Sequence, residues 1–224
     1  MSMILPAPTY YWRTRENTGT TTTSRFVANT ITLANGATWG VGINGSAIEL
    51  DGVNDNCTLA TTITMGVGDS LSWWMNWDVI AKMSWGASTN ANDYVWHELT
   101  NTLTVRATGT AVNFTIPVQI ADTWYHFVLT RHSTDKADVY VNGVVSTTGS
   151  GTLGAVDMAL NRFGSRGDGT FPFNGQGTEM AYWNGTVLTA AQAVRIYNNG
   201  APSDLTKMGR SDPASITGLM DGRV

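Results

Sequence analysis

The 224-residue chain has few charged side chains and only one cysteine. Charged residues make up 13% of it, whereas an average soluble domain has about 25%. Threonine, serine, asparagine and 24 glycines take their place. Cys57 alone cannot form an intrachain disulfide framework. The sequence therefore excludes a small disulfide-stapled scaffold.

The chain also lacks the sequence features of membrane insertion, secretion and nucleic-acid binding. No apolar run approaches the roughly 18 residues of a membrane span. Residues 1–8 lack the basic and apolar regions of a secretory signal, so we expect no export by the general secretory route. The formal net charge is −4, with 17 acidic and 13 basic residues. This balance predicts no nucleic-acid partner and no attraction to anionic lipid.

Strand signals dominate what is present. Leu71, Trp73, Met75 and Trp77 alternate with mostly polar residues, which is the pattern of a sheet packed on one face. Asn142-Gly143 between two β-rich runs predicts a hairpin with a type I′ turn. Asn-Gly dipeptides also begin at Asn35, Asn44, Asn174, Asn184 and Asn199, where we expect further turns.

One short helix is predicted near the C-terminal end. Thr189 and Gln192 form a capping box in front of residues 190–197, and Asn199-Gly200 supplies a left-handed stop. Many strands and one helix predict a single all-β domain of two packed sheets over residues 10–201. We expect an extended N-terminal arm at residues 1–9 and a polar tail at 202–224.

Several segments resemble, in the right order, the motifs of one family. They are Tyr11-Trp12, the run Ser46–Asp55 ending in Asp-Gly-Val-Asn-Asp, Ser70–Met75, Trp124–Thr130, Tyr140-Val141-Asn142-Gly143 and the helix ending Ile196-Tyr197-Asn198. The chain is similar to the laminin-G-like branch of the concanavalin A-like lectin/glucanase superfamily. The resemblance implies an antiparallel jelly-roll sandwich.

The departures from that family concern its calcium site and its catalytic site. Arg13, Ser24 and Thr178 stand where the family has acidic residues, so we expect no bound metal and no cofactor. The alternative is a degenerate calcium site formed by Asp51, Asp55 and Glu179. The paired-carboxylate motif of the glucanase branch is missing, because none of the four glutamates begins it. We therefore predict that the chain is not an enzyme.

Two short motifs are better explained by turns and loops than by ligand recognition. Residues 40–45 fit the dinucleotide fingerprint G-x-G-x-x-G, but they precede a strand instead of leaving one for a helix. The tripeptide Arg166-Gly167-Asp168 lies in a loop and is interpreted as a tight turn.

The nine tryptophans suggest contact with sugars, because flat apolar rings suit the C–H faces of pyranoses. Trp73 and Trp77 are expected in the core, and Trp74 is expected to pack on the opposite face. Trp85 and Trp96 lie in a less regular stretch and are the candidates for exposed aromatics. His97 and Asn92 could add hydrogen bonds there.

The sequence therefore predicts a non-enzymatic, lectin-like structural protein. We expect it on a virion surface or outside the cell, as a capsid decoration or fibre-type component that attaches to other virion or assembly proteins. Oligomerisation would use the terminal arms, and cell-surface glycans are expected ligands. The alternative is a stand-alone carbohydrate-binding module, with a glycoside hydrolase ranked third.

Overall fold

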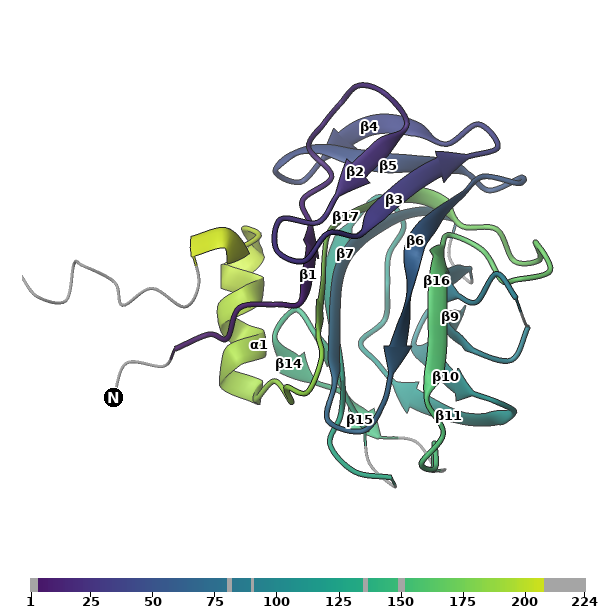
Figure 1. The fold of residues 1–224 in the computed structure, drawn as a ribbon. Coiled ribbons are helices and arrows are strands. Elements are labelled where there is room, and N and C mark those ends of the chain that lie inside the picture. Colours follow the sequence, from purple (N-terminus) through teal and green to yellow (C-terminus); the bar gives the residue numbers. More distant parts are fainter. Residues whose placement is uncertain (1–3, 80–81, 90, 135–136, 149–151, 208–224) are drawn as a thin grey trace, which may run out of the picture.

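The fold is all-β, with two antiparallel sheets packed face to face and one short helix, as the sequence predicted (Figure 1). The structure is a computed structural model that describes residues 4–79, 82–89, 91–134, 137–148 and 152–207. Both sheets are continuous across the sandwich, and their inner faces enclose the main core.

Sheet A carries the helix. Its strand order is β14 (Val144–Val145), β13 (Ala137–Val141), β12 (Trp124–Arg131), β7 (Ser70–Val79), β17 (Asn174–Trp183), β5 (Gly45–Asp51) and β4 (Thr38–Gly42), and β1 (Tyr10–Trp12) pairs with β17 off this path. Figure 1 shows α1 (Ala190–Tyr197) on one side of this sheet and the other sheet opposite. Two short 3₁₀ turns follow, η1 (Asn198–Gly200) and η2 (Leu205–Lys207).

Sheet B closes the other side of the sandwich. Its order is β15 (Thr147–Thr148), β11 (Thr110–Thr115), β10 (Thr102–Ala107), β9 (Tyr94–Leu99), β8 (Met83–Gly86), β16 (Met158–Phe163), β6 (Asn56–Met65), β3 (Thr30–Ala34) and β2 (Thr21–Thr23). No helix among the described residues covers the outer face of this sheet.

Strand β7 shows how the sequence pattern builds the core. Leu71, Trp73, Met75 and Trp77 all point inward and are fully buried, which confirms the predicted alternation. Trp74, on the opposite face, is also buried, because α1 covers that side. The rings of Trp74 and Tyr197 stack with centroids 5.7 Å apart. The central strand is thus buried on both faces.

The turn chemistry is confirmed at the hairpin and at the helix. Asn142 and Gly143 have φ angles of 51° and 79°, as a type I′ turn requires. The capping box is present, with Thr189 N–H donating to Gln192 Oε1 at 2.8 Å. The turn expected at Asn174-Gly175 is wrong, because this dipeptide lies inside β17. A Cβ on Gly175 would lie 2.2 Å from the Asn76 carbonyl oxygen, so glycine is required there by close strand approach.

The ends of the described chain pack against the sandwich. Leu5 and Leu205 are buried in a second apolar cluster with Trp183 and Ile196, between sheet A and α1. Trp183 Nε1–H also donates to the Pro6 carbonyl oxygen at 2.9 Å. Residues 4–9 and 202–207 therefore contribute Leu5 and Leu205 to the packed interior. Residues 1–3 and 208–224 lie outside the described residues, so assembly through them stays a prediction.

We expect Leu5→Ala and Leu205→Ala each to lower the free energy of unfolding by about 2–4 kcal/mol, because each leaves a cavity in a packed cluster. Denaturant unfolding measures this. Ile4→Ala is the control, since Ile4 is 65% exposed and should change stability by less than about 0.5 kcal/mol. Equal, small effects at all three positions would show that the ends do not contribute to the fold.

Candidate functional site

Aromatic side chains gather on the outer face of sheet B along β9. This strand alternates, so Val95 and His97 point into the core, while Tyr94 and Trp96 lie on the other face, where Tyr94 is buried and Trp96 is half-buried. The Tyr94 and Trp96 rings meet edge to face at 6.3 Å. On β10, which is paired with β9, the Arg106 guanidinium lies over the Tyr94 ring at 5.7 Å.

Phe171 extends this cluster from the loop that precedes β17. Its ring lies 5.0 Å from the Trp96 ring, and 39% of its surface is exposed. Its φ angle is 54°, a left-handed conformation that is strained for a bulky residue. Strain and exposure together at an aromatic residue are typical of functional sites. We call Tyr94, Trp96 and Phe171 the aromatic shelf.

A hydrogen-bonded ion pair lies beside the shelf. The Arg166 guanidinium lies 5.3 Å from the Phe171 ring centre and pairs with Asp168, its Nε–H donating to Oδ1 at 3.1 Å. The Arg166 hydrogen bond holds the pKa of Asp168 well below its usual range, helped by bonds from Thr170. Gly169 N–H donates to the Arg166 carbonyl at 2.9 Å, as in the tight turn that the sequence predicted.

A small hollow opens next to this pair. Its volume is about 200 Å³, and it is lined by Ser88, Thr89, Ala91, Gly167 and Asp168. The Asn161 amide fixes one wall, since it accepts from Ser88 N–H at 2.7 Å and donates to Ser88 Oγ at 2.8 Å. Hydroxyl, carboxylate and guanidinium groups therefore meet within a few residues of the aromatic shelf.

The structure buries two of the four glycan-binding candidates proposed from sequence, which were Trp85, Trp96, His97 and Asn92. The exposure expected for Trp85 is wrong, because its side chain lies in the core against Phe163. His97 is also fully buried, between Trp77 and Phe127, so it cannot reach a ligand on the surface. Both lie on the inward side of their strands.

Trp96 is a half-buried member of the shelf and Asn92 is exposed just before β9, and their role with glycans stays a prediction. Reading β9 with period 2 from Val95 would have placed Tyr94 beside Trp96. Phe171 carried no sequence signal, because its exposure depends on the fold of a loop.

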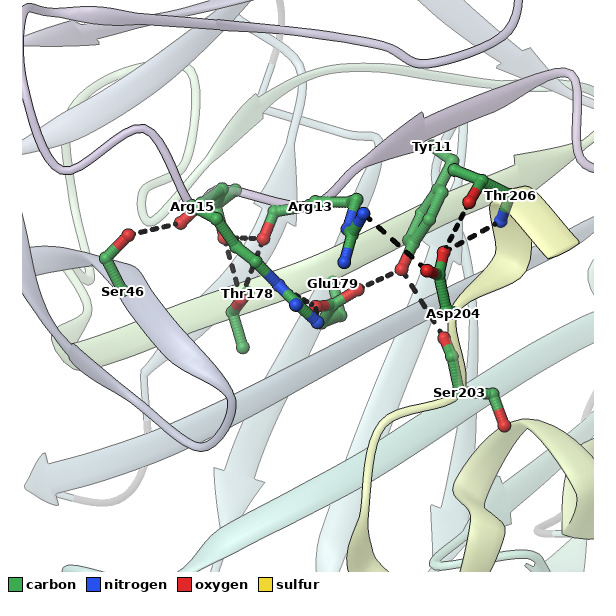
Figure 2. A network of polar contacts seen from close by, with 10 residues as sticks. Tyr11, Arg13, Arg15, Ser46, Thr178, Glu179, Ser203, Asp204 and Thr206 are labelled. Carbon is green, nitrogen blue, oxygen red and sulfur yellow. Dashed lines mark hydrogen bonds and ion pairs between the residues drawn. The ribbon is translucent and has the colours of Figure 1, made fainter.

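A second polar cluster surrounds Glu179 on sheet A (Figure 2). The register of β17 against β7 shifts between Thr178 and Ala181, and Glu179 has a φ angle of 49°. Its carboxylate accepts from the Tyr11 hydroxyl and from Arg15, whose Nε lies 2.9 Å away. Burial raises the pKa of Glu179, and burial raises that of Tyr11 as well.

This arrangement bears on the degenerate calcium site. Glu179 is taken up by Tyr11 and Arg15, whereas Asp55 accepts from the Asp51 N–H at 3.1 Å in a turn at the other end of β5. Over the described ranges, no three His, Cys, Asp or Glu residues are grouped as metal ligands. The fold therefore does not bring Asp51, Asp55 and Glu179 together as one set of ligands.

Comparison with family models gave no match, and comparison with the curated proteins gave none either. Solved structures do match. Domain 4 of the GH43 extracellular arabinanase AbnA of Geobacillus stearothermophilus, in complex with arabinotriose, is 18% identical with a TM-score of 0.65; the match covers 85% of this chain and 98% of that domain. This chain is therefore similar in extent to a whole domain of that arabinanase.

Two longer proteins match over part of their length. A structure of botulinum neurotoxin type C, whose cell entry depends on two ganglioside molecules, is 12% identical with a TM-score of 0.64; it covers 86% of this chain and 51% of that one. Trypanosoma rangeli sialidase is 12% identical with a TM-score of 0.64, covering 91% and 37%. These likenesses show the lectin-like sandwich fold. None of the described helices is long and apolar enough to cross a membrane.

We expect stability to fall as the pH falls from about 6.5 to about 3. Burial lowers the pKa of both His97 and His126 to about 3 in the folded chain. In the unfolded chain each takes up a proton near pH 6.5, so unfolding binds protons across this range. Each histidine should contribute a slope of up to about 1.4 kcal/mol per pH unit, measured by denaturant unfolding.

His97→Leu should remove about half of this slope. An unchanged slope in His97→Leu would mean that His97 is not held neutral in the folded chain.

Proposed function

We propose that this chain is a non-enzymatic carbohydrate-binding domain whose aromatic shelf receives a sugar ring. The observation that carries the proposal is Phe171, an exposed aromatic ring held in a strained conformation against Trp96. Sugar rings present apolar C–H faces that pack on such rings. A strained, exposed ring costs free energy in the free protein, and a bound sugar would bury it.

The Arg166–Asp168 pair supports the same ligand. A sugar carries adjacent hydroxyl groups that both donate and accept hydrogen bonds. The guanidinium offers donors and the carboxylate offers acceptors, fixed relative to each other by their ion pair. The adjoining hollow of about 200 Å³ lies directly beside this pair, since Gly167 and Asp168 line it.

The absence of catalysis is part of the proposal. Glycoside hydrolysis needs two carboxyl groups that face the same bond and admit water. The carboxylate of Glu179 is 3% exposed and bonded to Tyr11 and Arg15. Asp168 is engaged by Arg166 and Thr170, so its carboxylate is not poised to give or accept a proton.

We also propose, from composition, that the domain acts on a virion surface or outside the cell. Its lysine-poor surface, rich in threonine, asparagine and glycine, supports this location. The alternative is a stand-alone module with the same sugar site. Purification of the native protein separates the two, because a virion component would co-sediment with particles and a stand-alone module would not.

We expect Phe171→Ala to weaken binding of the best ligand at least tenfold, about 1.4 kcal/mol, because it removes the exposed ring of the shelf. The measurement is isothermal titration calorimetry against arabinotriose, cellotriose, laminaritriose and ganglioside headgroups. Phe171→Tyr keeps a ring and should retain binding.

Phe26→Ala is the matched control, because Phe26 is exposed to a similar extent, 38%, but lies outside the shelf. Equal loss in both alanine variants, or no binding to any of these ligands by the parent chain, would refute the proposal.

We further expect no reducing ends to appear when the chain is incubated overnight with laminarin, xylan or arabinan, since Glu179 and Asp168 are both held by hydrogen bonds within the protein. Reducing-sugar assays measure this. Turnover that survives purification and disappears in Glu179→Gln would overturn the non-enzymatic assignment.

A further inference from the structure

A second hollow lies on sheet A, whereas the aromatic shelf lies on sheet B. It is a groove of about 570 Å³ between the segment after β1 and the β4–β5 hairpin, lined by Arg15, Asn17, Gly40, Val41, Asn44, Gly45 and Ser46. Its volume is more than twice that of the hollow beside Asp168. We call it the hairpin groove.

Arg15 is a fixed wall of this groove. Its Nε and Nη2 both donate to one oxygen of the buried Glu179, and the Tyr11 hydroxyl holds the other oxygen (Figure 2). The side-chain stem passes Gly45, where an added Cβ would lie 3.7 Å from Arg15 Cδ. Within the described parts of the chain, the remaining nitrogen Nη1 has no hydrogen-bond partner. The ion pair thus fixes the Arg15 stem along the groove beside Gly45.

The other walls offer both donors and acceptors. Asn17 and Asn44 are exposed, and their amides make no hydrogen bond to another described residue. Ser46 Oγ–H donates to the Thr14 carbonyl at 3.1 Å, which leaves its oxygen free to accept (Figure 2). Two primary amides and a hydroxyl can each bond the oxygen of a ligand hydroxyl or its proton.

The charges around the groove decide the class of ligand. Arg15 is paired with Glu179, Arg13 lies 3.7 Å from Asp204, and Arg25 lies 3.3 Å from Glu16. Each of these cations has its own carboxylate, and the Glu49 carboxylate lies against Gly40 of the lining, so the region has no surplus positive charge to attract an anion. Valine is the one apolar side chain of the lining, and no aromatic ring lines the groove. A neutral, polyhydroxylated ligand fits this set of groups.

We propose that the hairpin groove is a second saccharide site, which holds a neutral di- or trisaccharide by hydrogen bonds without ring stacking. This inference rests on the proposed carbohydrate-binding function and adds a site to it. The shelf lies on sheet B and the groove on sheet A, so one chain would hold two glycan segments. Two linked contacts raise the effective affinity for a polysaccharide or a glycan-covered surface.

Stoichiometry tests this proposal. We expect the parent chain to bind two equivalents of a neutral trisaccharide, with arabinotriose, cellotriose and laminaritriose as probes, in calorimetry supported by NMR titration. Asn17→Gly and Asn44→Ala should each weaken the groove site at least fivefold, and Phe171→Ala should remove the shelf site only. Glycine suits position 17 because its φ angle is 55°.

Asn199→Gly is the matched control, since Asn199 is also exposed and left-handed, with a φ angle of 54°, but lies in η1. One equivalent bound, abolished by Phe171→Ala and unaffected at Asn17 and Asn44, would overturn the groove site and leave the proposed function standing. No binding of any trisaccharide would overturn both. Binding of sialyllactose in preference to the neutral probes at the groove would overturn the neutral class.

Discussion

The burial of the central strands of sheet A, β12, β7 and β17, on both faces is the constraint on which the rest of the structure depends. One face of a sheet can pack on the partner sheet, but the second face is exposed to solvent unless other segments pack on it. Here the outer face carries Val128, Ala181 and Trp183, so it requires α1 and the two ends of the described chain. The helix and ends are therefore parts of the core, and the domain cannot be reduced to its two sheets.

The same double burial explains the polar cluster at Glu179. A carboxylate that points into the covered side of sheet A loses its water and needs donors from the protein. The irregularity of β17 places Glu179 there, and Tyr11 and Arg15 supply the donors. Because both come from the segment that begins at β1, the buried charge ties that segment to the sheet. Arg15 is then held at the hairpin groove as a consequence of core electrostatics.

Sequence reasoning succeeded where local patterns decide the outcome. The alternation in β7, the Asn142-Gly143 turn and the capping box at Thr189 depend on neighbours close in the chain. It failed where the exposure of a side chain depends on which part of the fold packs on that face of the strand. The sequence predicts that Trp74 packs on the outer face of β7, but nothing in that strand shows that α1 is what covers it. Trp85 differs from Trp96 only in which face of sheet B it meets. Phe171 and Arg15 take their places from loops and from a register shift, which leave no periodic signal.

Because both faces of the central strands of sheet A are packed, the surfaces left for a ligand are the edge of sheet A and the outer face of sheet B. The two candidate sites follow that division, with the shelf on β9 and the hairpin groove at the β4–β5 rim. Each site contains an arginine that is held by an ion pair within the protein, with Asp168 at the shelf and with Glu179 at the groove. Pairing each arginine within the protein removes the preference for anions and keeps the donors oriented. A paired arginine therefore suits the proposed recognition of hydroxyl patterns, whereas a free arginine would select charge.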